Sequence, residues 1–114
     1  MNEPFGAIVR RMADRVTLDL SGDIDGFADQ KLQAAYDEAE RASPGLIVLN
    51  FSAVRYINST GIALIVGLLA RARKAHCRLS AYGLSEHYVE IFQITRLADF
   101  MQIYPDEASV GAAA

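Results

Sequence analysis

Disulfide-forming cysteine pairs and long hydrophobic runs are both missing from this sequence. Cys77 is the single cysteine among 114 residues. One cysteine cannot form a disulfide within the chain, which is typical of proteins in a reducing compartment. The most apolar stretch, from Ile62 to Ala70, is far shorter than the roughly 20 residues that a membrane-spanning helix needs. These absences predict a protein without internal disulfides or spanning helices.

An excess of positive charge is also absent. Eleven lysines and arginines stand against fourteen aspartates and glutamates, which gives a net charge of −3. A chain without a basic field is poorly suited to hold a phosphate backbone, so we expect no nucleic-acid partner. The segment from Met1 to Ala7 lacks the basic start and apolar core of a signal peptide. We therefore expect a cytoplasmic protein with no direct membrane insertion.

The sequence contains no recognisable catalytic motif. The two histidines, His76 and His87, stand in no triad context, and the residues around Ser59 do not form a G-x-S-x-G turn. Asp23 and Asp25 have no third metal ligand nearby, so we interpret them as turn and cap residues. The glycines form neither a G-x-G-x-x-G nor a Walker pattern. The sequence predicts a protein that is not an enzyme and binds no metal or cofactor.

The chain does contain enough apolar residues for one compact domain over residues 1–114, with 52% hydrophobic and 22% charged residues. Short apolar or alternating stretches predict strands at 7–12, 16–20, 46–49, 78–82 and 102–104. Periodic stretches predict helices at 28–40, 61–74 and 86–94, a short turn at 97–100 and a weak helix from 105. The stretch 21–26 is predicted to be a loop in which Asp25 or Gly26 caps the next helix. This order predicts an α/β fold: a mixed, mostly parallel sheet with an N-terminal hairpin, covered by about four helices.

Between the central strand and the helix predicted to start near Gly61 lie three residues whose side-chain oxygens suit a helix N-cap: Asn58, Ser59 and Thr60. The last two carry hydroxyls. One hypothesis is that they cap this helix, a role that contributes about 1 kcal/mol. The other is that they accept a phosphate. At a helix N-terminus a phosphate meets unpaired N–H groups and the positive end of the helix dipole, so the fold would tolerate it. The two hypotheses are compatible.

The helix after Gly61 has one hydrophobic stripe, predicted to comprise Ile62, Ile65, Val66, Leu69 and Ala72. This phase leaves Leu64 exposed beside Ser59 and Thr60. A single exposed leucine is common on protein surfaces. An apolar residue next to a modifiable serine also suits a docking surface that phosphorylation controls, and we favour this interpretation.

The stretch from Leu46 to Val54 leads directly into Tyr56 to Ile62. This central segment resembles the signature of STAS domains and, more narrowly, of the bacterial anti-sigma-factor antagonists. The stretch from Ser21 to Asp25 is similar to the family's Gly-x-hydrophobic-Asp element, and Phe92 to Leu97 resembles its C-terminal helix and turn. The similarity extends from about Ala7 to about Ala108 and implies the STAS fold.

The resemblance implies a binding protein in a partner-switching circuit. In this family the unphosphorylated protein binds an anti-sigma factor that is also an ATP-dependent serine/threonine kinase, and so releases a sigma factor. The kinase phosphorylates the first hydroxyl residue of the motif, which ends binding, and a metal-dependent serine phosphatase removes the phosphate. In this sequence the acceptor would be Ser59, with Thr60 as the less favoured alternative.

The same resemblance implies a set of partner-binding residues: Asp23, Asp25, Asn58, Ser59, Thr60, Gly61 and Leu64. Asp25 matches the acidic residue that lies near the acceptor loop in the family. Asn58 departs from the aspartate that is more usual before the serine, which removes one negative charge beside the site.

A second function is compatible with the same fold. The chain could be an unphosphorylated STAS scaffold, or an accessory subunit of a signalling or membrane transport complex. Ser59 and Thr60 would then serve only as helix caps, and Leu64 would pack permanently against a partner. Nucleotide binding is a more distant third possibility.

Overall fold

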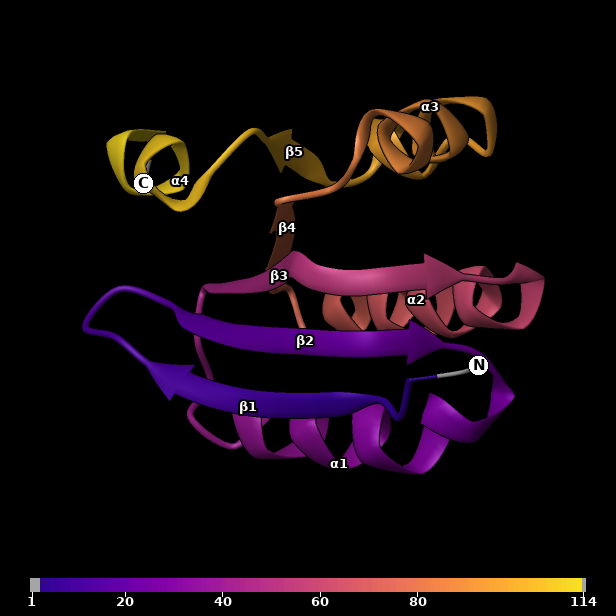
Figure 1. Cartoon of the computed structure of the whole chain (residues 1–114). Coiled ribbons are helices and arrows are strands. Elements are labelled where there is room, and N and C mark those ends of the chain that lie inside the picture. The colour runs from indigo at the N-terminus through magenta and orange to yellow at the C-terminus, as the bar shows by residue number, and fades with distance from the viewer. Residues whose placement is uncertain (1–2, 114) are drawn as a thin grey trace.

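The computed structural model describes residues 3–113, which form a five-stranded sheet with helices packed against it (Figure 1). The strands are β1 (Gly6–Arg11), β2 (Val16–Ile24), β3 (Leu46–Ile57), β4 (Arg78–Tyr82) and β5 (Gln102–Tyr104). The helices are α1 (Asp29–Glu40), α2 (Ser59–Lys74), α3 (Glu86–Ile94) and α4 (Glu107–Ala113), with 3-10 turns η1 (Gly26–Ala28) and η2 (Leu97–Asp99). The strands lie in the order β1-β2-β3-β4-β5. Only the β1–β2 hairpin is antiparallel within this sheet, which confirms the predicted α/β fold.

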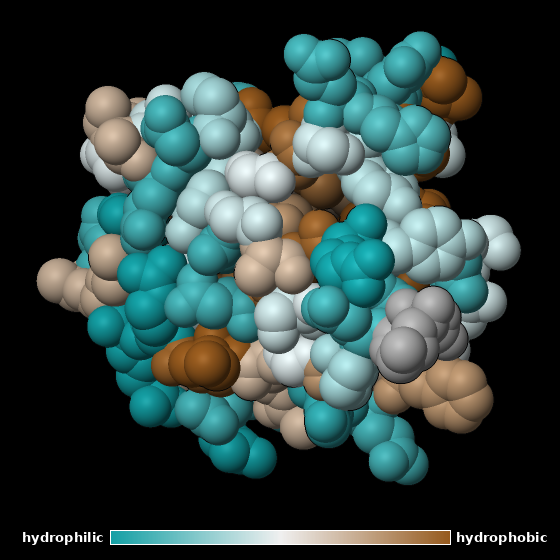
Figure 2. Space-filling view, in the orientation of Figure 1, coloured by the Kyte–Doolittle hydropathy of each residue, from teal (hydrophilic) through white to brown (hydrophobic). Residues whose placement is uncertain are grey.

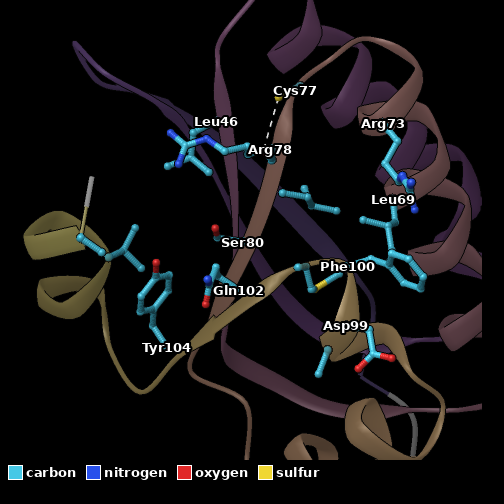
Figure 3. Close-up of a pocket in the computed structure, with 15 residues that line it drawn as sticks. Leu46, Leu69, Arg73, Cys77, Arg78, Ser80, Asp99, Phe100, Gln102 and Tyr104 are labelled. Atoms are coloured by element: carbon cyan, nitrogen blue, oxygen red, sulfur yellow. Dashed lines mark hydrogen bonds between the residues drawn. The ribbon is translucent and has the colours of Figure 1, made fainter.

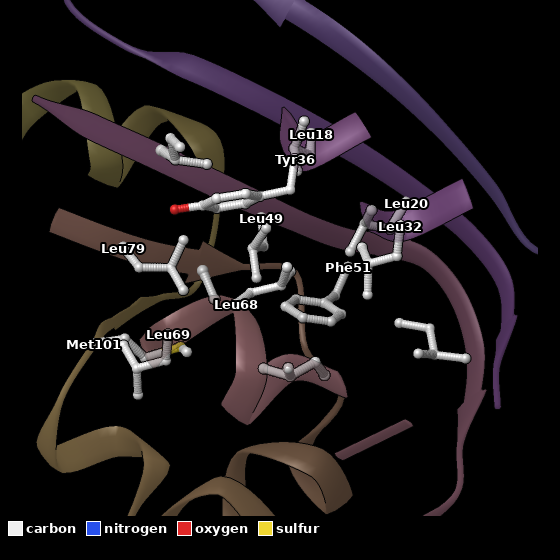
Figure 4. Close-up of a cluster of buried hydrophobic side chains, with 14 of the residues drawn as sticks. Leu18, Leu20, Leu32, Tyr36, Leu49, Phe51, Leu68, Leu69, Leu79 and Met101 are labelled. Atoms are coloured by element: carbon white, nitrogen blue, oxygen red, sulfur yellow. The ribbon is translucent and has the colours of Figure 1, made fainter. Parts of the chain in front are cut away.

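Alternation along the strands separates two faces of the sheet. In the hairpin Ala7 pairs with Leu20 and Val9 with Leu18, and all four side chains join the main hydrophobic core. Helices α1 and α2 cover this face and contribute their own buried stripes. Figure 4 shows the leucines of β2, α1, β3, α2 and β4 converging on one cluster. Within residues 3–113 no helix is long and apolar enough to cross a membrane.

The other face of the sheet carries a polar network. Arg10 donates from Nε to Asp19 (2.6 Å) and from Nη1 to Glu107 (3.0 Å), so the network joins β1, β2 and α4. Asn50 on β3 donates to the same Asp19 carboxylate at 2.8 Å. Burial alone would raise the pKa of Asp19, but the hydrogen bonds from Arg10 and Asn50 outweigh it and hold this pKa below its usual value. In the view of Figure 2 the surface is mainly hydrophilic, with hydrophobic atoms gathered in a recess at upper centre.

Two strands are longer than the sequence predicts. The stretch 21–26 was expected to be a loop, yet β2 continues to Ile24, and β3 continues past the predicted end at residue 49 to Ile57. The parallel pairing joins Asp23 to Tyr56 and Ile24 to Ile57, with register shifts on the way. Pairing of the backbone groups with the neighbouring strand thus outweighs the weak strand propensity of glycine and the polar residues. The extension carries the end of β3 to the start of α2.

A buried tyrosine on α1 lacks a hydrogen bond. The hydroxyl of Tyr36 has no partner among residues 3–113, although the side chain is fully buried. The guanidinium carbon of Arg71 lies 4.5 Å from the centre of the Tyr36 ring. Burial, with the Glu40 carboxylate nearby, raises the pKa of Tyr36 to about 12. Tyr36 is therefore held by its ring and not by its hydroxyl.

We expect Tyr36→Phe to raise the free energy of unfolding by about 1 kcal/mol, because it removes a buried polar group that has no partner. Tyr88→Phe is the matched control, since the Tyr88 hydroxyl accepts a hydrogen bond from the Ile57 N–H at 2.8 Å. That variant should lose about 1 kcal/mol. Urea unfolding of both variants measures the two changes, and a loss of stability in Tyr36→Phe would contradict the first expectation.

Candidate functional site

The candidate site lies where β2 and β3 end and α2 begins. The N–H of Asn58, directly after β3, donates to the carbonyl of Ile24 at the end of β2 (3.2 Å). Tyr88 on α3 steadies the same end of β3, because its hydroxyl accepts from the Ile57 N–H. Two elements that are distant in sequence, β2 and α3, thus hold the segment that carries Ser59.

Asn58 is the N-cap of α2. Its side-chain oxygen accepts a hydrogen bond from the Gly61 N–H at 2.8 Å, and its carbonyl accepts from the Ile62 N–H at 2.9 Å. The prediction that Ser59 and Thr60 cap a helix near Gly61 is therefore wrong: they are the first two residues of α2. Asparagine is among the strongest capping residues, and at position 58 it is the one in extended conformation just before the helix.

The hydroxyls of Ser59 and Thr60 are consequently free of a structural role. Both residues are exposed, and within residues 3–113 neither side chain forms a hydrogen bond. Their N–H groups likewise have no acceptor in this part of the chain, as expected for the first turn of a helix. The positive end of the α2 dipole lies here, and three cations occupy the last turn of the helix. An anion at Ser59 would meet free donors and a favourable field.

Gly61 allows the first turn of α2 to approach β2 closely. A Cβ atom at this position would lie 2.0 Å from the carbonyl oxygen of Ile24 and 3.0 Å from the side chain of Ile57. The first contact is far too short for a real side chain, and the second is tight. The position of Ser59, two residues earlier, therefore depends on the absence of a side chain at Gly61.

The turn η1 places an acid and an aromatic beside the start of α2. Asp25 caps this turn by accepting from the Phe27 N–H at 2.9 Å, so it caps η1 and not α1 as predicted. Gly26 is adjacent to Thr60, since a Cβ on Gly26 would lie 3.7 Å from the Thr60 methyl. Phe27 points outward and is 94% exposed. No sequence pattern indicated Phe27, because one aromatic residue in a short turn has no periodicity.

Asp23 is on β2 and not in a turn, contrary to the prediction. Its side chain is 6% exposed and accepts a hydrogen bond from the Glu3 N–H at 3.2 Å. The Asp23 N–H in turn donates to the Glu3 carbonyl. Asp23 therefore fastens the N-terminal segment to the sheet, and little of its side chain is left for a partner.

The hydrophobic phase of α2 differs from the predicted one. The buried residues of the helix are Gly61, Ile65, Leu68, Leu69 and Ala72. Leu64, predicted to be exposed, is half-buried and packs against the core, whereas Val66, predicted to be buried, is 46% exposed. The outer face of α2 accordingly runs from Ser59 through Ala63 and Val66 to Ala70. Val66, about two turns after Ser59, is therefore the large apolar residue on this exposed face.

A hollow of about 490 Å³ lies away from Ser59, beside β4, β5 and the last turns of α2 (Figure 3). Its lining includes Leu46 at the start of β3, Arg78 at the start of β4 and Arg73 in the last turn of α2. No residue of the acceptor segment lines it. Within residues 3–113 no three metal-ligating side chains come together. The candidate site is thus an exposed serine at the start of α2, and the hollow nearest to it, of about 350 Å³, is lined by Asp23, Asp25 and Phe27.

Comparison with known proteins points to one family. A family model described as "Mlab, STAS domain" matches residues 8–103 of this chain. The anti-sigma-B factor antagonist of Listeria monocytogenes is 29% identical over 97 residues, which are 84% of each chain. The protein of the same name in Staphylococcus aureus is 27% identical over 84 residues, 74% of this chain and 78% of the relative. These matches confirm the resemblance seen in the sequence.

Solved structures share the fold. An anti-sigma factor antagonist from Mycobacterium paratuberculosis superposes with a TM-score of 0.83 at 19% identity, covering 96% of this chain and 93% of that one. The Bacillus cell fate determinant SpoIIAA in its phosphorylated form gives a TM-score of 0.71 at 20% identity, covering 97% and 100%. At such identities the likeness concerns the fold.

We expect Gly61→Ala to lower the free energy of unfolding by about 1–3 kcal/mol, because the new methyl group meets the Ile24 carbonyl. Gly67→Ala is the matched control on the same helix. No atom lies within 4 Å of a Cβ at Gly67, so alanine should stabilise the helix there by up to about 1 kcal/mol. Thermal unfolding monitored by circular dichroism measures both, and equal shifts in the two variants would refute the packing argument.

A second pair of variants separates capping from exposure. Asn58→Ala removes the cap of α2 and should cost about 1 kcal/mol of unfolding free energy. Ser59→Ala should change stability by less than about 0.5 kcal/mol, because the hydroxyl makes no contact that supports the fold. Chemical denaturation provides both values. A larger loss in Ser59→Ala than in Asn58→Ala would show that the serine is the cap after all.

Proposed function

This chain belongs to the STAS domain family, and we propose that within it the protein acts as an anti-sigma-factor antagonist switched by phosphorylation of Ser59. In the unphosphorylated state it binds an anti-sigma factor that is also a serine/threonine kinase, which releases a sigma factor. Phosphorylation at Ser59 ends the binding, and a metal-dependent serine phosphatase restores it. The names of the curated relatives support the coarser part of this proposal.

The observation that carries the proposal is the free hydroxyl of Ser59. Asn58 supplies the helix cap, so the serine is exposed at the first position of α2 without a structural task. A kinase can reach the Ser59 hydroxyl without unfolding any element. The product, with a charge of about −2, lies at the helix N-terminus, where N–H groups and the dipole stabilise it. Phosphorylation would thus change the surface and leave the fold intact.

Around Ser59 the surface offers apolar contact area for a partner. Phe27 on η1 is 94% exposed, Tyr56 near the end of β3 is 53% exposed, and Val66 on α2 is 46% exposed. Large exposed aromatic side chains are enriched among the residues that dominate binding energy. A doubly charged group among them would have to lose its water in the complex. We infer that Ser59 lies within the contact area.

Asn58 bears on the strength of this switch. An aspartate at the cap would place a negative charge next to the phosphate, whereas asparagine caps the helix and stays neutral. Residue 58 is therefore neutral in both states of the switch, and the two states differ at this position only by the charge of the phosphate on Ser59. A tenfold change in affinity needs only about 1.4 kcal/mol, which desolvation of a phosphate can readily exceed.

An unphosphorylated scaffold, or an accessory subunit of a signalling or membrane transport complex, is the alternative function. In that alternative Ser59 and Thr60 serve only as helix caps, but the N-cap of α2 is Asn58. The structure leaves the two hydroxyls with no role that this alternative would explain. We therefore retain the scaffold as an outcome of the test and not as an equal proposal.

The test measures binding of the chain to its cognate anti-sigma kinase, identified by co-purification and then purified. Wild type and Ser59→Ala should bind with similar affinity, and Ser59→Glu should bind at least about tenfold more weakly. With ATP, mass spectrometry should find one phosphate on the peptide that contains Ser59 and none in Ser59→Ala.

Thr60→Ala is the matched control, since it removes the neighbouring exposed hydroxyl and keeps Ser59. It should retain both binding and phosphate uptake. Loss of the phosphate in Thr60→Ala but not in Ser59→Ala would move the acceptor to Thr60. Equal binding of one partner by wild type and Ser59→Glu, without phosphate uptake, would reject the switch and leave the scaffold.

A further inference from the structure

A shallow groove of about 290 Å³ lies beside the C-terminal half of α2. Its walls are Val66, Leu69 and Ala70 of α2 on one side, with Leu97 of η2 and Phe100 on the other. Phe100 is 54% exposed, and the lining is mainly apolar. Leu69, Arg73 and Phe100 also line the neighbouring 490 Å³ hollow, and Figure 3 shows these three side chains near one another. Exposed apolar side chains that surround a groove are typical of an interaction surface.

The rim of the groove is positively charged. The guanidinium carbon of Arg73 lies 4.9 Å from the centre of the Phe100 ring, and within residues 3–113 no carboxylate is at salt-bridge distance from Arg73. Arg96, also on the rim, pairs with Asp99 at 2.6 Å. Helix α2 contains no acidic residue at all. A protein of net charge −3 thus presents an apolar groove with an unpaired cation.

We propose that this groove receives an amphipathic helix of the partner protein, with an apolar anchor between Val66 and Phe100 and acidic side chains facing Arg73. Helix-in-groove binding uses anchors spaced i, i+3 or i+4, and i+7. The charge of Arg73 selects acidic flanks and disfavours basic ones. The ring of Phe100 forms one wall of the anchor site.

The groove continues the surface around Ser59. The exposed face of α2 runs from Ser59 through Ala63 to Val66, a distance of about 10 Å along the helix axis. Small side chains along this path let a partner helix lie close to α2. The inference rests on the proposed function in so far as the partner is the same anti-sigma factor, which would contact the acceptor serine and the groove together.

The test uses a helical peptide of about 15 residues as the probe, with leucines at i, i+4 and i+7 and glutamates on the flanks. A second peptide carries lysine in place of every glutamate. Both are titrated into the isotope-labelled full chain, and backbone amide shifts are followed by NMR. The acidic peptide should shift the amides of Val66, Ala70 and Leu97, and should bind about tenfold more tightly than the basic one.

Three variants sharpen the result. Arg73→Glu should reverse the preference between the peptides, and Phe100→Ala should weaken binding of the acidic peptide about tenfold. Arg41→Glu is the matched control, because it makes the same change of charge at an exposed residue just after α1. It should keep the preference of the wild type. Both Arg73 and Phe100 are exposed, so these variants should fold, which the NMR spectra also verify.

Several outcomes would overturn the proposal. They are equal affinity for the two peptides, shifts confined to other surfaces, and an equal effect of Arg41→Glu and Arg73→Glu. Shifts at the groove that depend on protein concentration without peptide would assign the face to a second copy of this chain. Because none of these measurements involves Ser59, they can fail while the phosphorylation switch holds, and the reverse is also true.

Discussion

The close approach of α2 to the end of β2 is the contact on which the site depends. A helix that begins directly after a strand must turn sharply, and here the turn is held by backbone groups: the Asn58 N–H donates to the Ile24 carbonyl. The same carbonyl oxygen occupies the space that a side chain on Gly61 would need. These two contacts hold the strand end, the turn and the first helical turn together, and they place Ser59 without any contact from its own hydroxyl.

This arrangement separates structural from functional polar groups. The Asn58 side chain accepts a hydrogen bond from the Gly61 N–H, and Asp25 accepts one from the Phe27 N–H in the turn before α1. Asp23 accepts one from the Glu3 N–H and so holds the N-terminal segment. Each of these side chains has a partner, whereas Ser59 and Thr60 have none in the described part of the chain. In a folded protein polar side chains that support the structure are usually paired. Unpaired hydroxyls at an exposed helix start are thus available for chemistry that the fold does not need.

Much of the fold could be predicted because the spacing of apolar residues along the chain reflects which side chains are buried. The alternation in β2 and the helical stripe of α1 depend on side chains that face the core, and both predictions are confirmed. The extension of β3 to Ile57 could not be found in this way, because its last residues alternate little and are fixed by pairing with β2. Local sequence contains the propensity of a strand but not the position of its neighbour.

The phase of α2 shows a second limit. The predicted and the observed stripes share Ile65, Leu69 and Ala72. Leu68 is buried where Val66 was predicted to be, and Ile62 is half-buried where full burial was predicted. Leu68 and Val66 are both aliphatic, so hydrophobicity cannot choose between them. Gly61 is buried against the Ile24 carbonyl, a close approach that a residue without a side chain allows. Because glycine adds nothing to a hydrophobic pattern, periodicity could not place this contact, and the predicted stripe left out the first buried residue of the helix.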